Sequence, residues 1–174
     1  MTTTVAFLRG VNLGKRKVLS ADLVRCFAVM DFPGAKPLLA SGNVLFETDP
    51  DPNLSARIEA GLEAQFGFPI GTVLRTLDEL RAMLAADPFG DRAEDENTKL
   101  YVTLMRDALP AGLQLPSVPG DYTIVRVDAR EIYIFAHRLP NGRFGEGMDK
   151  LGKVLDKAGL ATTRNWNTII KAAR

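Results

Sequence analysis

The sequence predicts an α+β fold of two ferredoxin-like halves, each an antiparallel sheet with helices on one side. Short alternating runs typical of strands are interrupted by segments whose apolar residues recur every three or four positions. Glycine, proline and asparagine mark the boundaries between these segments. The order of elements over residues 1–76 is β-α-β-β-α-β, and residues 77–174 repeat part of it before a C-terminal helix. We therefore expect two halves, 1–76 and 77–174, packed as one unit.

Four short runs in the first half have the composition and alternation of strands. They cover residues 3–9, 37–40, 44–46 and 70–75. The tripeptide Ser41-Gly42-Asn43 separates the middle two, and Gly-Asn between strands predicts a tight hairpin there. We expect the following strand to be buried through Val44 and Phe46 on one face.

Two helices are expected between these strands. Ser20 is expected to cap the first helix, whose apolar face carries Leu23, Phe27 and Met30. Asp51 is expected to cap the second helix, with Pro52 in its first position and Gly67 at its end. Its apolar residues recur at a spacing of four, at Leu54, Ile58, Leu62 and Phe66.

The second half is expected to begin with a helix, because Thr76 and Glu79 have the spacing of a capping box. The strands that follow are expected at residues 99–105, 122–127 and 132–136. Residues 108–120 contain three prolines, which favour a loop. Two more helices are expected, from Met148 to Gly159 and from Thr163 to Arg174, the latter with Arg164 and Asn165 in its first turn.

Composition excludes several classes of protein. The chain has 22 Lys and Arg against 21 Asp and Glu, and this net charge of +1 excludes a bulk polybasic nucleic-acid binder. One cysteine and one histidine exclude an internal disulfide and a structural zinc site. No apolar run is long enough for a membrane span, and no signal peptide is evident, so we expect a cytoplasmic protein.

The charges are unevenly distributed along the chain. Residues 1–20 contain four basic residues and no acidic one, whereas residues 47–96 contain twelve acidic and four basic residues. Residues 137–174 are basic again, with eight bases and three acids. Two interpretations follow: the charges solvate opposite faces, or the two basic ends meet on one surface that attracts an anion.

A glycine-rich segment follows the first expected strand directly and carries most of the N-terminal charge. It runs from Gly10 to Lys17 as GVNLGKRK. Backbone N–H groups in such a loop can turn toward an anion, and adjacent cations add attraction. The spacing is neither that of a P-loop nor that of a dinucleotide-binding motif. The alternative is a loop whose glycines only permit its turns.

Two further segments carry groups suited to anions or bases. Residues 140–147 hold three glycines before a helix N-terminus. They form either an anion nest with Arg143 or a flexible connection, and Glu146 favours the second because its carboxylate would repel an anion. Residues 162–168, TTRNWNT, contain the only tryptophan. Trp166 either stacks on a base beside Arg and Asn side chains, or anchors the core while the asparagines hold the helix start.

The remaining reactive residues favour structural roles. His137 lies at a strand end with no nucleophile or acid beside it in sequence, and Cys26 sits inside the first helix. We expect no metal or cofactor, because the acidic residues at 91–96 lack the spacing of a calcium loop.

Three strings together resemble a bacterial family known as domain of unknown function 1697. They are residues 7–14 (FLRGVNLG), 40–46 (ASGNVLF) and 163–168 (TRNWNT). The resemblance implies a two-part α+β structure with ferredoxin-like halves, and it implies no activity.

The leading functional hypothesis is a binding module for an anionic ligand, a nucleotide or a nucleic acid. The expected ligand-binding residues are Arg9, Asn12, Lys15, Arg16, Lys17, Asn43, Arg164, Asn165, Trp166 and Asn167. This set requires residues 9–17 and 163–168 to be neighbours in the fold. The alternatives are an enzyme acting on a small phosphorylated or anionic substrate, with His137 as the obvious base, and a homo-oligomeric interaction protein.

Overall fold

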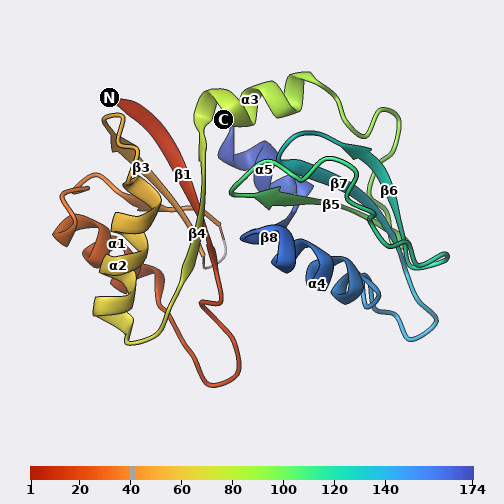
Figure 1. Ribbon diagram of the computed structural model, residues 1–174, viewed down its shortest axis with the longest axis horizontal. Helices are drawn as coiled ribbons and strands as arrows, with labels where there is room; N and C mark the ends of the chain where they lie inside the picture. The colour runs from red at the N-terminus through yellow and green to blue at the C-terminus, as the bar shows by residue number, and fades with distance from the viewer. Residues whose placement is uncertain (40–41) are drawn as a thin grey trace. The chain divides into compact units, whose positions relative to one another are not determined.

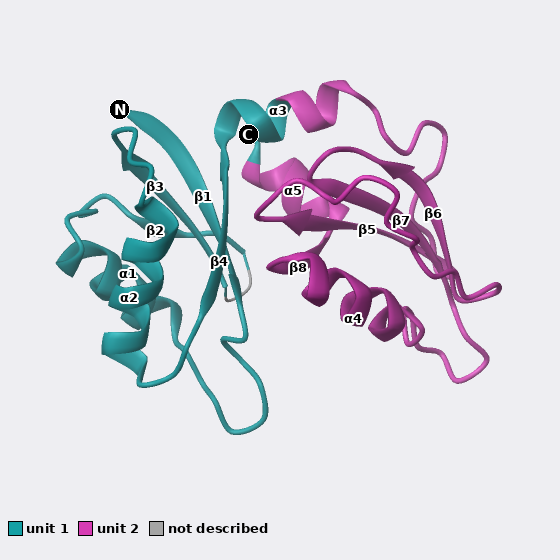
Figure 2. Ribbon diagram, viewed as in Figure 1, with its two compact units in different colours: residues 1–81, 173 teal, residues 82–172, 174 magenta. Residues whose placement is uncertain are grey.

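The computed structural model describes residues 1–39 and 42–174, which divide into two compact units. Unit 1 comprises residues 1–81 with Ala173, and unit 2 comprises residues 82–172 with Arg174 (Figure 2). Each unit is built on a four-stranded antiparallel sheet (Figure 1). The predicted α+β fold class is confirmed.

Unit 1 has its elements in the predicted order β-α-β-β-α-β. They are β1 (Thr2–Arg9), α1 (Ser20–Val29), β2 (Lys36–Pro37), β3 (Asn43–Thr48), α2 (Leu54–Phe66) and β4 (Gly71–Thr76). The strand order in the sheet is β2-β3-β1-β4, and all neighbours are antiparallel. Strand β1 is therefore central, with Phe7 opposite Asn43 on one side and Val73 on the other.

Helices α1 and α2 cover one face of this sheet (Figure 1). The core between them includes Ala6, Leu8, Leu23, Phe27, Val44, Phe46, Ile58 and Leu62. Three aromatic rings meet there, with the centroid of Phe46 lying 5.2 Å from that of Phe27 and 4.9 Å from that of Phe32. The predicted burial of Val44 and Phe46 on one face is confirmed.

The connection before β3 differs from the predicted tight hairpin. Asn43 is the first residue of β3, so the connection consists of residues 38–42, of which 40 and 41, including the predicted turn residue Ser41, lie outside the described residues. The backbone N–H of Leu38 donates to the Asn43 carbonyl at 2.9 Å, and Nδ2 of Asn43 donates to the Leu38 carbonyl at 3.2 Å. Strand β2 is shorter than predicted, and Leu39 has a left-handed φ of 57°, which is incompatible with continued strand pairing.

Unit 2 repeats the strand order but not every helix. After α3 (Leu77–Ala85), which joins the units in sequence, come β5 (Thr98–Met105), β6 (Tyr122–Val127), β7 (Glu131–His137), α4 (Met148–Ala158), β8 (Ala161–Asn165) and α5 (Trp166–Ala172). The sheet order β6-β7-β5-β8 corresponds to that of unit 1. Residues 106–121 take the place of the first helix as the proline-containing loop that the sequence predicts.

Strand β8 corrects the prediction of a helix from Thr163. Residues 161–165 pair antiparallel with β5, and the hydroxyls of Thr103 and Thr163 lie 2.8 Å apart. Threonine is β-branched and favours strands, and β5 offers an open edge for this pairing. The final helix therefore begins only at Trp166, and Arg164 and Asn165 lie in a strand.

The two faces of the unit 2 sheet are covered by different helices. Leu151 and Leu155 of α4 pack in one core with Ile132 and Ile134 of β7. Because side chains alternate along a strand, Tyr133 faces the opposite side, where Trp166 of α5 contacts it.

Gly61 of α2 packs against the C-terminal end of α1, where Sγ of Cys26 bonds to its carbonyl. A methyl group at this position would lie 2.2 Å from Sδ of Met30. We expect Gly61→Ala to lower the free energy of unfolding by about 1–3 kcal/mol, because overpacking outweighs the better helix propensity of alanine. Urea unfolding followed by circular dichroism measures the change.

The matched control for this substitution is Gly152→Ala in α4. A methyl group there meets no atom within 4 Å, so the control should stabilise by about 0.5–1 kcal/mol. In a protein that already carries Met30→Ala, Gly61→Ala should no longer cost stability, because the side-chain atoms that the added methyl group would meet are gone. A Gly61→Ala protein as stable as the parent would show that Met30 moves aside without cost.

Candidate functional site

The segment from Arg9 to Lys17, here called the cationic loop, follows β1, and contacts with the unit 1 core hold its two ends in place. Val11 and Val18 are both buried in the unit 1 core. Oδ1 of Asn12 accepts a hydrogen bond from the Val18 N–H at 3.3 Å. These contacts hold the two ends of the loop against the core, and the loop projects beyond the end of the sheet (Figure 1).

Two glycines permit the turns within the cationic loop. Gly10 has a φ of +79° and Gly14 a φ of +58°, a region that other residues rarely adopt. The N–H of Arg16 donates to the Leu13 carbonyl at 3.0 Å, which adds a turn inside the loop. The positions of the two glycines are therefore explained by the turns that they permit, as the sequence-based alternative holds. This alternative does not explain why the loop carries so many cations.

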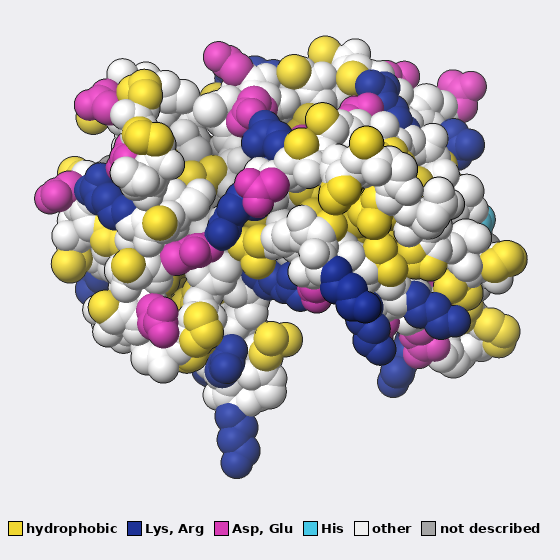
Figure 3. Space-filling view, in the orientation of Figure 1, with side chains coloured by type: hydrophobic (Ala, Val, Ile, Leu, Met, Phe, Trp, Pro, Cys, Tyr) yellow, Lys and Arg dark blue, Asp and Glu magenta, His cyan; other side chains and the backbone are white. Residues whose placement is uncertain are grey.

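Three of the cations in this loop are exposed and have no ionic partner in the described part of the chain. Lys15, Arg16 and Lys17 form no ion pair with a carboxylate among the residues that the structure describes. Basic side chains accordingly project from this end of unit 1 (Figure 3). Arg9 is half-buried at the end of β1, opposite Gly71. The loop thus presents uncompensated positive charge to solvent.

Asn43 lies at the same end of the sheet but performs a structural role. Its strand runs antiparallel to β1, and the Leu8 N–H donates to the Gly42 carbonyl at 2.7 Å. Only 4% of Asn43 is exposed, and its side chain is bonded to the Leu38 carbonyl. It supports the connection beside the cationic loop.

The asparagines of the second predicted segment hold a carboxylate of their own unit. Nδ2 of Asn165 donates to Oε1 of Glu94 at 2.7 Å, and Nδ2 of Asn167 donates to Oε2 at 3.0 Å. The Leu100 N–H also donates to Oε1 of Glu94, at 2.9 Å. Oδ1 of Asn165 accepts the Asn167 N–H at 2.8 Å, as an N-cap residue does.

Trp166 is part of an aromatic cluster in unit 2. Its ring centroid lies 5.3 Å from that of Phe89 and 5.8 Å from that of Tyr133, both in edge-to-face geometry. Only 8% of the residue is exposed. This arrangement matches the sequence-based alternative in which Trp166 anchors the core.

Arg164 is half-buried on β8 and bonds to its neighbours there. One of its terminal nitrogens donates to the Thr162 hydroxyl at 2.7 Å and to the Thr163 carbonyl at 3.0 Å. Burial lowers the pKa of its guanidinium to about 10, so the group remains charged at neutral pH.

The predicted site residues therefore fall into two sets. Unit 1 brings together Arg9, Asn12, Lys15, Arg16, Lys17 and Asn43, and unit 2 brings together Arg164, Asn165, Trp166 and Asn167. The expectation that both sets contribute to one site stays a prediction. Sequence reasoning missed the role of Glu94, because no local pattern connects it to Asn165 and Asn167 some seventy positions later.

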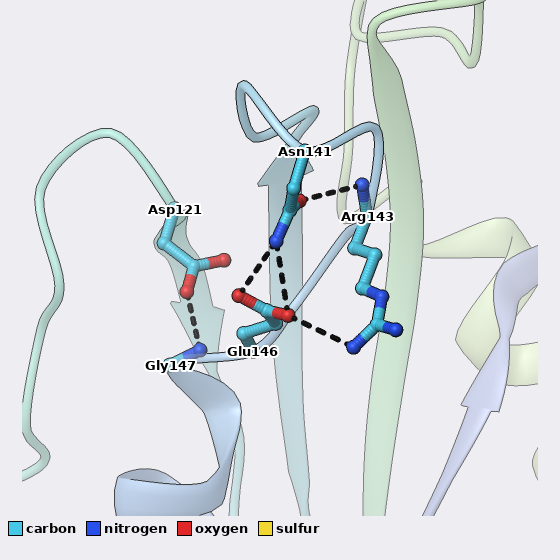
Figure 4. A network of polar contacts seen from close by, with 5 residues as sticks. All are labelled: Asp121, Asn141, Arg143, Glu146 and Gly147. Carbon is cyan, nitrogen blue, oxygen red and sulfur yellow. Dashed lines mark hydrogen bonds and ion pairs between the residues drawn. The ribbon is translucent and has the colours of Figure 1, made fainter.

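The loop over residues 140–147 is occupied by carboxylates of the protein itself (Figure 4). Asp121 accepts a hydrogen bond from the Gly147 N–H at the start of α4. Nδ2 of Asn141 donates to both oxygens of Glu146, and Arg143 lies 3.4 Å from the same carboxylate. These groups take the positions that an external anion would need, so the loop is not a candidate anion site.

Cys26 and His137, the other reactive residues noted in the sequence, both pack in structural surroundings. Cys26 is buried, its Sγ donates to the Gly61 carbonyl at 3.5 Å, and burial raises the pKa of its thiol. The ring of half-buried His137 packs edge-to-face on Phe135. Within residues 1–39 and 42–174, no group of three His, Cys, Asp or Glu side chains could hold a metal ion, and no helix could span a membrane.

Comparison with known proteins supports the fold. A family model described as protein of unknown function (DUF1697) matches residues 1–133, which contain two of the three strings noted in the sequence. The solved structure of the conserved bacterial protein SP0830 from Streptococcus pneumoniae is similar, with a TM-score of 0.66 and 21% identity over 99% of this chain and 97% of that chain. At this identity the likeness shows a shared fold alone. No curated protein sequence matches the chain.

Proposed function

The chain belongs to the family of proteins of unknown function DUF1697, and we propose that it is a binding module for an anionic ligand, a nucleotide or a nucleic acid. One observation carries the proposal. Lys15, Arg16 and Lys17 are exposed on a loop anchored at both ends, without a carboxylate partner among the described residues. Such a surface attracts phosphate groups through charge, independently of base sequence.

The position of the loop supports this role. It follows a central strand of the unit 1 sheet, so its base is held by β1 and by the Asn12 contact to Val18. A loop held in this way loses less conformational freedom on binding than a flexible tail does. In the proposal Arg9, Lys15, Arg16 and Lys17 contact the ligand, whereas Asn12 and Asn43 keep the loops in shape.

Binding of a labelled ten-nucleotide oligo(dT) at several salt concentrations tests the proposal. On a single strand, log affinity should fall with log salt with a slope of about −0.7 for each phosphate neutralised. Replacing Lys15, Arg16 and Lys17 together by alanine should flatten the slope by about two units. Fluorescence anisotropy of the labelled strand is the measurement, because it reports binding without relying on the buried Trp166.

A charge-matched control separates a specific loop from general positive charge. It replaces three exposed lysines of α4, namely Lys150, Lys153 and Lys157. This control should leave the salt slope unchanged. Equal flattening in both triple variants, or no binding by the parent protein even at low salt, would contradict the proposal.

A further inference from the structure

Arg16 differs from the two lysines beside it in being packed on an aromatic ring. The centre of its guanidinium lies 4.6 Å from the ring centroid of Phe68. Lys15 and Lys17, on either side in the sequence, have no such contact among the described residues. A guanidinium at this distance over a ring is attracted by the negative face of the π-system.

The fold holds Phe68 where Arg16 can reach it. Helix α2 ends at Gly67, whose φ of +80° turns the chain back toward the sheet. The ring of Phe68 is half-buried against the unit 1 core and lies 6.4 Å from that of Phe66. The ring that supports Arg16 is therefore fixed by packing.

This support gives Arg16 an additional capability. A guanidinium is planar and weakly hydrated, and its two faces can stack on flat groups. Phe68 contacts it from one side, while the Arg16 side chain as a whole remains exposed. Proteins that bind single-stranded nucleic acids stack unpaired bases on aromatic rings and on arginine planes of this kind.

We propose that Arg16, supported by Phe68, is a stacking position for a nucleobase of a single-stranded nucleic acid whose phosphates contact Lys15 and Lys17. This inference rests on the proposed function and names its ligand class. A single strand fits better than a duplex, because bases within a duplex are already paired and stacked. Leu13, 62% exposed in the same loop, adds apolar surface of the kind that a base covers.

The test compares three labelled probes: ten-nucleotide oligo(dT), a ten-unit abasic strand with the same phosphates, and a ten-base-pair duplex. Because one stacked base adds to the affinity, oligo(dT) should bind about tenfold more tightly than the abasic strand. Abasic and oligo(dT) probes that bind equally would overturn the stacking position and leave the phosphate-binding loop intact. Duplex binding as tight as oligo(dT) binding would also overturn it. If none of the probes binds, both proposals fail.

Two variants separate stacking from charge. Arg16→Lys keeps the charge and loses the planar group, and Phe68→Leu keeps apolar volume and loses the ring that supports it. Both should remove most of the tenfold preference for oligo(dT) over the abasic strand while leaving the salt slope unchanged. Phe144→Leu, which removes a half-buried ring from unit 2, is the control. A preference retained in Arg16→Lys, which leaves the core untouched, would overturn the inference whatever the stability of Phe68→Leu.

Discussion

Replacing Trp166 by alanine is expected to lower the free energy of unfolding by about 3–5 kcal/mol, the range for removing a buried aromatic side chain. Trp166 is 8% exposed and makes edge-to-face contacts with Phe89 and Tyr133. Its loss leaves a cavity beside these two rings, whose centroids already lie 5.7 Å apart in edge-to-face contact. Chemical denaturation, with hydrogen exchange in β7 and α5, measures the effect.

Trp166→Phe is the control for this prediction, because it retains an aromatic ring in the cluster and should lose less stability. A ligand-stacking tryptophan predicts a different pattern, in which Trp166→Ala weakens oligonucleotide binding and leaves unfolding unchanged. That result would contradict the structural role of the cluster and restore Trp166 as a binding residue.

Local patterns predicted the elements that depend on local contacts. The capping box at the start of α3 is present as expected: the Thr76 N–H donates to Oε2 of Glu79 at 2.8 Å, and the Glu79 N–H donates to Oγ1 of Thr76 at 3.1 Å. Gly67 ends α2 in a left-handed conformation, as predicted. In each case the residues that determine the geometry are at most three or four positions apart.

Elements that depend on distant partners were predicted less well. Residues 161–165 form a strand because β5, some sixty positions earlier, offers them a hydrogen-bonding edge. Apolar spacing in the segment after Thr163 favoured a helix, and that spacing is real from Trp166 onward. The error therefore lay in the start of the helix, where tertiary pairing outweighed the local pattern.

The candidate site shows the same division. The cations of residues 9–17 are visible in the sequence because they are consecutive and lack acidic neighbours. The contact of Arg16 with Phe68 joins residues that are far apart in sequence, so no spacing rule could find it. The asparagines at 165 and 167 suggested ligand binding because their partner, Glu94, lies 71 positions before Asn165.

Replacing Glu94 by alanine should remove a connection between the acidic loop before β5 and the start of α5. Its carboxylate accepts hydrogen bonds from Asn165, Asn167 and the buried Leu100 N–H. Hydrogen bonds to charged groups contribute about 1.5–3 kcal/mol each, and donors left without an acceptor add a cost. Because the three bonds share one carboxylate, we expect a total loss of about 2–4 kcal/mol in the free energy of unfolding.

The control is Glu96→Ala, two positions further along the same loop, where the side chain is exposed and the change should stay within about 0.5 kcal/mol. Glu94→Gln should lose an intermediate amount of stability, because it keeps one oxygen acceptor but places an amide group opposite an asparagine amide.

Tyr101 provides a second readout: burial, and to a lesser extent the charge of Glu94, raises the pKa of its phenol. Removing that negative charge favours the phenolate, so ultraviolet titration of Glu94→Ala should show a lower pKa for Tyr101, still raised by burial. Unchanged stability together with an unchanged tyrosine titration would mean that Glu94 does not hold the two asparagines in solution, and would return Asn165 and Asn167 to the set of residues available for a ligand.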